Sequence, residues 1–299
     1  MSVESTPSPE RLPGIDPAAS DRWQRLPHER SPWLHEEVAS RMLERLQWFR
    51  QPPQSWVHWE PILGGLQAHA KLRAALPHAR WRVASTQMAR AQAATREPAP
   101  RSWLTWRRPE ARAEDIAAPV QLVWANMALH GHPSPHRLLS QWRDWLAPEG
   151  FLLMSCLGPD SLGELRAVYR AMGWPAPAHE FMDMHDWGDL LVRAGFAEPV
   201  MDMERLTLTY GSAEALLAEL REIGRNLASQ RFGALRGRGW RARLIDALEA
   251  HGARDASGRL QLTFEIVYGH AVRVADRPRS SETSLSLDDV RAQLRARRG

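Results

Sequence analysis

Alternating strand-type and helix-type segments between residues 56 and 158 constrain the fold of this chain more than any other feature. Strand-type runs occur at WVHWE, ARWRVAS, VQLVWANMAL and FLLMSCLG, and SWLTW at 102–106 is a weaker candidate. Helix-type segments such as LQAHAKLRAAL and SPHRLLSQWRDWL lie between them. Because nearly continuous apolar strands that alternate with helices build parallel sheets, the stretch predicts an α/β fold with helices on both faces.

The strand candidates nearer the C-terminus have a different pattern. Apolar and polar residues alternate strictly in residues 204–210 and 258–274. One face of the second run would carry Leu260, Leu262, Phe264, Ile266 and Tyr268. Strict alternation is typical of antiparallel strands with one buried face. The order therefore predicts a seven-stranded sheet, with five parallel strands and a terminal antiparallel pair.

Three helix signals complete the pattern. SLGE at 161–164 has the sequence of a capping box, and Asp183 is placed to cap another helix. Near the N-terminus, an amphipathic helix is predicted by apolar residues spaced four apart, namely Leu34, Val38, Met42 and Leu46.

The two ends of the chain differ in composition from its interior. Residues 1–20 are rich in Pro and Ser, and residues 276–299 are mostly polar, so both tails are expected to be disordered, the second one mostly so. Residues 21–275 are expected to form one domain. Within it, residues 21–50 and 212–255 would supply helical cap elements.

Composition limits the class of protein. The chain of 299 residues is 43% hydrophobic, enough for a large buried core. Lys+Arg number 39 and Asp+Glu 35, a mild excess that permits an acidic partner without requiring nucleic acid. Cys156 is the single cysteine, so no intramolecular disulfide can form. Because neither a signal peptide nor a run of about 18 apolar residues occurs, a cytoplasmic protein without a membrane span is expected.

Five segments, in this order, carry a resemblance to a known family: LVWANMALH at 122–130, LAPEGFLLMSCLGPDSLGELR at 146–166, FMDMHDWGDLLVRAGFAEPVMD at 181–202, LTLTY at 206–210 and TFEIVYGHA at 263–271. They resemble the malonyl-acyl-carrier-protein O-methyltransferases of biotin synthesis, a branch of the class I S-adenosylmethionine-dependent methyltransferases. The resemblance implies the class I methyltransferase fold, which is Rossmann-like. It also implies S-adenosylmethionine as cofactor and a carrier-bound malonyl carboxylate, or another small carboxylic acid, as methyl acceptor.

The resemblance also implies where the cofactor would bind. In the family, the first strand ends in an acid and a glycine-rich turn, and an acid that ends the second strand accepts hydrogen bonds from the ribose. Glu60, Gly64 and Gly65 stand at the first position, and Ser85 stands where the second acid is expected. The sequence therefore predicts an altered cofactor loop.

Asn126 and Met127, after the fourth predicted strand, are expected to lie where cofactor and acceptor meet in the family. Asn126 could instead cap the end of that strand. His28 matches by position a residue that closes over the cofactor, and we group it with the substrate-binding candidates.

The acceptor side is expected to need a cation and no general base. A malonyl carboxylate is ionised at neutral pH, so an arginine that aligns it with the methyl donor would suffice. Arg225 and Arg231 are the predicted substrate-binding residues. The other interpretation is that these arginines only solvate a surface loop.

A patch of arginines around Trp240 could dock an acidic acyl carrier protein. It comprises Arg236, Arg238, Arg241 and Arg243. Arginines around an aromatic ring also suit RNA, but nucleic acid is not expected because the charge excess is small. The spacing of His130, His132 and His136 fits no zinc pattern, so no metal site is predicted. A second hypothesis stays open: a non-catalytic homologue that acts through a protein partner, since the cofactor loop is altered. The sequence does not predict the oligomeric state.

Overall fold

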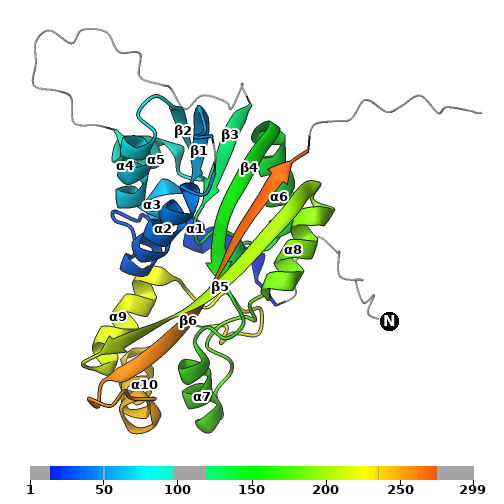
Figure 1. Cartoon of the computed structure of the whole chain (residues 1–299). Coiled ribbons are helices and arrows are strands. Elements are labelled where there is room, and N and C mark those ends of the chain that lie inside the picture. The colour runs from blue at the N-terminus through cyan, green and yellow to red at the C-terminus, as the bar shows by residue number, and fades with distance from the viewer. Residues whose placement is uncertain (1–13, 50, 97–118, 235, 275–299) are drawn as a thin grey trace, which may run out of the picture.

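The computed structural model of the chain describes residues 14–49, 51–96, 119–234 and 236–274. At its centre is a six-stranded mixed sheet of order β2-β1-β3-β4-β6-β5 (Figure 1). The strands are β1 (Ser55–Trp59), β2 (Arg80–Ala84), β3 (Val120–Ala125), β4 (Leu146–Leu157), β5 (Phe196–Tyr210) and β6 (Leu260–Arg273). The first four are parallel, and β6 runs antiparallel to both β4 and β5. The predicted α/β sheet with a terminal antiparallel pair is confirmed.

The strand count differs from the prediction. Six strands lie in the described part of the chain, whereas seven were expected. The candidate at residues 102–106 falls outside the described residues, as do residues 1–13 and 275–299. A seventh strand therefore stays a prediction.

Helices cover both faces of the sheet. α2 (Trp33–Leu46) and α4 (Leu66–Ala75) pack on one face, and α6 (Pro135–Trp145) and α8 (Met184–Arg193) pack on the other. Alternation along the strands assigns the faces, because Trp56 contributes to the first core and Val57 to the second. The predicted apolar stripe of α2 is buried throughout. No helix among the described residues is long and apolar enough to cross a membrane.

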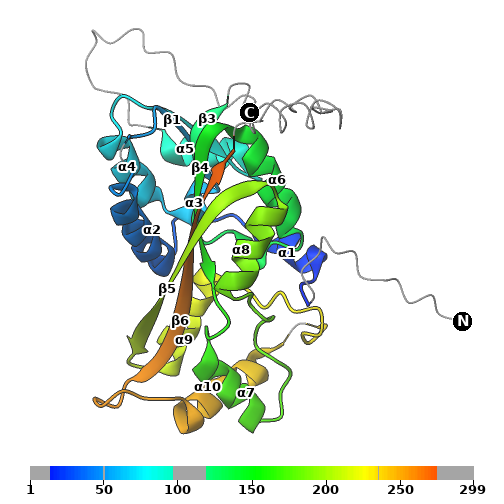
Figure 2. The same cartoon turned by 45° about the vertical axis from the view of Figure 1, so that its right-hand side comes forward.

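β5 and β6 continue beyond the parallel strands as a long two-stranded extension (Figure 2). β4 pairs with β6 only as far as Ile266, whereas β5 pairs with β6 to the Tyr210–Leu260 pair. Three helices lie beside this extension: α7 (Gly163–Ala171), α9 (Ala213–Ile223) and α10 (Arg238–His251). The predicted apolar face of β6 is buried, and none of its five side chains is more than 3% exposed.

The predicted N-terminal tail is wrong from residue 14 onward. α1 (Pro17–Gln24) begins with Pro at its first position, and the Asp16 carboxylate accepts a hydrogen bond from the Ala18 N–H. Both features favour a helix start. Ile15 also forms a β-bridge with Ala228. This long-range pairing fixes a segment whose local composition alone predicts disorder.

The predicted capping box at residues 161–164 is also wrong. α7 begins at Gly163, and no side chain caps it. The Ser161 hydroxyl bonds with the backbone of Glu265, and the Glu164 carboxylate accepts from the N–H and the hydroxyl of Thr263. β4 has ended before this part of β6, so the backbone groups of β6 on that side need other partners. Ser161 and Glu164 therefore serve the strand and not the helix.

The remaining helices connect these parts. α3 (Pro61–Gly64) is a single turn between β1 and α4, α5 (Met88–Thr95) follows β2, and a short 3-10 helix spans Leu129–Gly131. At α8, the Asp183 carboxylate accepts from the N–H groups of His185 and Asp186, so the predicted cap is confirmed.

Candidate active site

A cavity of about 750 Å³ opens at the carboxyl ends of the parallel strands. Its lining includes Glu60 after β1, Met127 after β3 and Leu157 at the end of β4. The chain passes from β1 to β2 on one side and from β3 to β4 on the other, so the strand order reverses at this edge. Open α/β sheets bind ligands at such switch points, which makes this cavity the candidate active site.

Three lining residues adopt a left-handed backbone conformation. The φ angles of Glu60, Met127 and Leu162 are 50°, 52° and 62°. This conformation is uncommon for residues other than glycine and costs about 1–3 kcal/mol at each position. Glu60 follows β1 directly, Met127 lies in the loop after β3, and Leu162 lies in the loop after β4. Strain is therefore concentrated where the strands reach the cavity.

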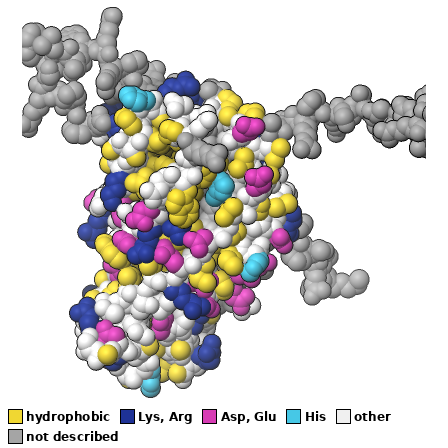
Figure 3. Space-filling model, in the orientation of Figure 1, with side chains coloured by type: hydrophobic (Ala, Val, Ile, Leu, Met, Phe, Trp, Pro, Cys, Tyr) yellow, Lys and Arg dark blue, Asp and Glu magenta, His cyan; other side chains and the backbone are white. Residues whose placement is uncertain are grey.

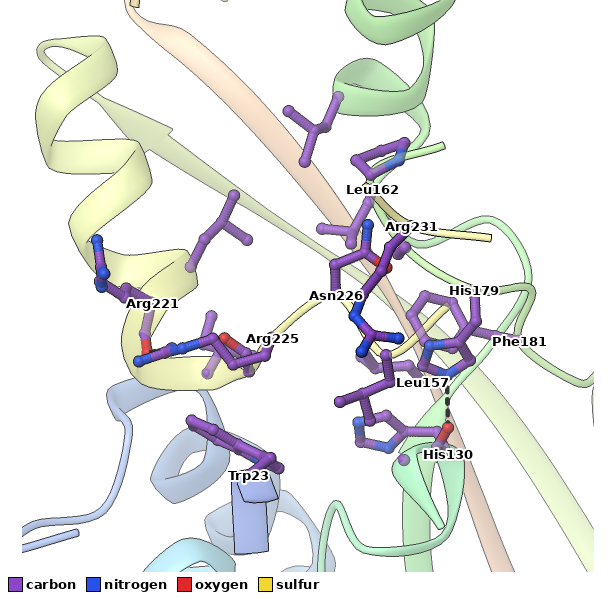
Figure 4. Close-up of a pocket in the computed structure, with 18 of the residues that line it drawn as sticks. Trp23, His130, Leu157, Leu162, His179, Phe181, Arg221, Arg225, Asn226 and Arg231 are labelled. Carbon is purple, nitrogen blue, oxygen red and sulfur yellow. Dashed lines mark hydrogen bonds between the residues drawn. The ribbon is translucent and has the colours of Figure 1, made fainter. Parts of the chain in front are cut away.

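Arginines line the cavity from more than one side, with Arg221 and Arg225 on one side and Arg231 on the other (Figure 4). Of the described residues that line the cavity, only Glu60 carries a carboxylate. The lining arginines are Arg221, Arg225, Arg231, Arg236, Arg238 and Arg241. This balance favours a ligand that carries negative charge.

Arg225 is a lining arginine that has no acidic partner in the described part of the chain. Its guanidinium donates to the carbonyls of Arg221 and Gly224 and lies 4.9 Å from the centre of the Trp23 ring. None of the ion pairs among the described residues includes it. Burial, and then the charge of Arg221, lower the pKa of Arg225. A cation whose charge no acid among the described residues balances is suited to hold an anionic ligand group.

Arg231 lies on the other side of the cavity (Figure 4) and already has a partner. Its guanidinium pairs with Asp16 at 2.6 Å and donates to the Ala228 carbonyl at 2.9 Å. The hydrogen bond from Arg231 lowers the pKa of Asp16. Of the two arginines selected from the sequence, Arg225 is therefore the one whose charge is not balanced by an acid.

Known proteins with related sequences identify the family. The malonyl-acyl-carrier-protein O-methyltransferase of Gallionella capsiferriformans is 36% identical over 269 residues, which cover 84% of this chain and 87% of that relative. The chain belongs to this methyltransferase family. The Methylovorus protein of the same name is 36% identical over 249 residues, covering 80% of this chain and 81% of that relative.

A third relative matches over a shorter region. The malonyl-acyl-carrier-protein O-methyltransferase of Laribacter hongkongensis is 42% identical over 176 residues, which cover 58% of this chain and 56% of that relative. No protein-family model matches the chain.

The two glycines of the methyltransferase loop are not among the cavity-lining residues. A Cβ on Gly64 would lie 2.9 Å from the His58 Nε2, and one on Gly65 would lie 3.1 Å from the Glu36 Oε2. Gly65 also has a φ of 116°, which strains any other residue. In this structure the glycines let the loop pack against β1 and α2. Their contact with a cofactor stays a prediction.

Asn126 lines the cavity, and its side chain forms hydrogen bonds with three other segments of the cavity wall. The amide donates to the carbonyls of His35 and Gly64, both at 2.8 Å, and its oxygen accepts from the Ser155 hydroxyl at 2.6 Å. The Met127 N–H donates in turn to that hydroxyl at 3.0 Å. The network ties the ends of β3 and β4 to α2 and to the loop after β1. Met127 also lines the cavity, and direct cofactor contact by either residue stays a prediction.

Ser85 and His28 contact lining residues without lining the cavity themselves. The Ser85 hydroxyl donates to the Glu60 carboxylate at 2.6 Å. The His28 ring meets the Trp23 ring edge-on, with 4.5 Å between their centres. Any effect of these two residues on binding would therefore act through Glu60 and Trp23.

Histidines also line the cavity, a role that no sequence pattern predicted. His35 Nδ1 lies 2.7 Å from the Leu63 carbonyl oxygen, and His179 Nε2 lies 2.7 Å from that of His130 (Figure 4). Burial lowers the pKa of His35, His130 and His179, that of His35 to about 4. The described residues contain no cluster of three or more metal-ligating side chains. The histidines therefore contribute neutral polar groups to the site.

Stability is expected to fall as the pH is lowered, because His35 is buried in its neutral form. Its pKa is about 4 in the folded protein and 6.5 ordinarily. Below about pH 6.5 the unfolded chain binds a proton that the folded chain does not bind until about pH 4, so stability is lost across this window. We expect a lower free energy of unfolding in urea at about pH 5 than at about pH 7.

His35→Asn is the matched variant for this measurement, since its amide can still donate to the Leu63 carbonyl. It is expected to reduce the pH slope of the unfolding free energy by up to about 1.4 kcal/mol per pH unit. An unchanged slope would show that His35 binds protons equally in the folded and unfolded states.

Proposed function

We propose that this protein transfers a methyl group from S-adenosylmethionine to the free carboxylate of malonyl-acyl carrier protein, as a step of biotin synthesis in the cytoplasm. The observation that supports this most is Arg225, which lines the cavity and has no acidic partner among the described residues. The relatives at 36% identity carry the name of this reaction. A single free cysteine, buried in β4, suits a reducing compartment.

The sheet edge of the cavity fits a nucleoside cofactor. The volume of about 750 Å³ lies in the usual range for ligand sites, and the position is the switch point of the sheet. Glu60, Met127 and Trp23 would surround the cofactor there. Once bound, S-adenosylmethionine supplies an activated methyl group on a sulfonium. The chain must then position the acceptor.

No general base is required, because a malonyl carboxylate is already ionised at neutral pH. The chain has to hold this carboxylate in line with the methyl group and exclude water. Arg225 can bind one carboxylate oxygen and leave the other free to attack. Because burial keeps His130 and His179 neutral, the positive charge on this side of the cavity belongs to the arginines.

The arginines near α10 support an acidic protein partner. Arg236, Arg238 and Arg241 line the cavity beside Trp240, and the Arg236 guanidinium carbon lies 3.6 Å from the centre of that ring. Positive charge around the opening would attract an acidic carrier protein and guide its acyl group inward. On the face shown in Figure 3, basic and acidic side chains are intermingled, an arrangement that does not favour a long polyanion such as RNA.

Acceptor selectivity tests the proposed function. Purified protein is incubated with S-adenosylmethionine and malonyl-carrier protein, acetyl-carrier protein or RNA, and released S-adenosylhomocysteine is measured. We expect turnover only with malonyl-carrier protein, since its acyl group ends in a free carboxylate and the acetyl group does not. Equal turnover with acetyl-carrier protein would contradict the role of the carboxylate. No turnover together with no cofactor binding would favour the non-catalytic alternative.

A further inference from the structure

The end of β2 lacks the side chain that nucleotide-binding sheets normally place there. In such sheets an acid near the end of the second strand accepts hydrogen bonds from the ribose hydroxyls. β2 ends at Ala84, and Ser85 and Thr86 follow it. Neither residue carries a carboxylate, so the second strand cannot itself supply that acceptor.

The structure brings a carboxylate to this place from β1. Glu60 Oε2 accepts from the Ser85 hydroxyl at 2.6 Å, and Glu60 Oε1 accepts from the Thr86 N–H at 2.5 Å. The Glu60 side chain thus rests on the two residues that follow β2. Glu60 also lines the cavity.

A backbone hydrogen bond and a left-handed backbone conformation accompany the position of the Glu60 side chain beside β2. Its N–H donates to the Ala84 carbonyl at 2.7 Å, which extends the pairing of β1 with β2 by one residue. Its φ is then 50°, a strained value for glutamate. Although Glu60 precedes α3, its side chain does not cap that helix. Strain of this kind is typical of functional positions, and here it accompanies a side chain directed at β2.

We infer that Glu60 has taken over the ribose-binding role of the missing second-strand acid. Each carboxylate oxygen can accept two hydrogen bonds, and each has one donor among the described residues. One acceptor position therefore remains on each oxygen. The neighbouring 2′ and 3′ hydroxyls of a ribose present two donors that match them. The inference rests on the proposed function, because it assumes that the nucleoside of S-adenosylmethionine occupies this edge of the cavity.

Binding measurements with two ligands test the inference. Calorimetry compares S-adenosylhomocysteine with an analogue that lacks both ribose hydroxyls, for the unmodified protein and for Glu60→Gln. Glutamine keeps the size of the side chain and one acceptor oxygen. We expect this substitution to weaken S-adenosylhomocysteine binding about tenfold or more. The analogue is expected to lose less than about twofold, because it cannot use the carboxylate.

Glu164→Gln is the matched control, since Glu164 also accepts two hydrogen bonds but does not line the cavity. It should leave both affinities unchanged. If Glu60→Gln does not fold, Glu60→Asp, which withdraws the carboxylate by one methylene, should show the same selective loss. Equal losses for both ligands, or no loss, would overturn the inference and leave the proposed function intact. Failure of the unmodified protein to bind S-adenosylhomocysteine would overturn both.

Discussion

Replacing Arg225 by alanine is expected to lower kcat/KM for malonyl-carrier protein by about a hundredfold. Removal of one partner of a desolvated charge pair costs about 2–5 kcal/mol, and the exposure of Arg225 at the cavity lining places it toward the lower end. In the proposed reaction this arginine holds the malonyl carboxylate, so the loss should fall on the acceptor. The affinity for S-adenosylhomocysteine should change by less than about twofold.

Two further variants show whether the Arg225 effect is specific. Arg193→Ala removes an exposed arginine at the end of α8, away from the cavity lining, and should leave kcat/KM unchanged. Arg225→Lys keeps the charge but replaces the planar guanidinium by a more strongly hydrated ammonium group, and it should give an intermediate value. Normal turnover by Arg225→Ala would contradict the assignment and direct attention to Arg221, its neighbour in the lining.

Asn126→Ala is expected to reduce the free energy of unfolding by about 3–5 kcal/mol. Asn126 is 2% exposed, and its loss would remove, within a buried wall, the donor to the carbonyls of His35 and Gly64 and the acceptor of the Ser155 hydroxyl. Asn126→Asp should be at least as destabilising, because a carboxylate cannot donate to the two carbonyls. Urea unfolding monitored by circular dichroism measures both effects.

Asn226→Ala provides the comparison for Asn126. Asn226 also makes amide hydrogen bonds, to the Ala176 carbonyl and the Ala228 N–H, but these bonds are not buried. Its loss should cost about 1 kcal/mol or less. If Asn126→Ala were no more destabilising than Asn226→Ala, the network at the ends of β3 and β4 would not stabilise the wall as described.

Local patterns in the sequence predicted the elements that depend on local spacing. The four-residue stripe of α2 and the alternating face of β6 are buried as expected, because a helix or strand repeats its side-chain direction with a fixed period. The Asp183 cap could also be predicted, since it bonds to N–H groups only two and three residues away.

The features that the sequence did not predict depend on contacts between distant segments. Arg231 differs from Arg225 because it meets Asp16, which belongs to a segment expected to be disordered. The bonds of Asn126 to His35 and Gly64 span 91 and 62 residues. Ser161 and Glu164 have a capping-box spacing, yet β6 offers them unpaired backbone groups. The spacing of residues along the chain does not reveal these long-range partners, because the partners come together only when the sheet has assembled.

The most direct test of the account is the intact mass of malonyl-carrier protein after incubation with this protein and S-adenosylmethionine. We predict the mass gain of one methyl group in place of a proton, located on the malonyl group and absent when acetyl-carrier protein is supplied. An unchanged mass, under conditions in which the protein is folded and binds S-adenosylhomocysteine, would contradict the proposed methyl transfer to the malonyl carboxylate.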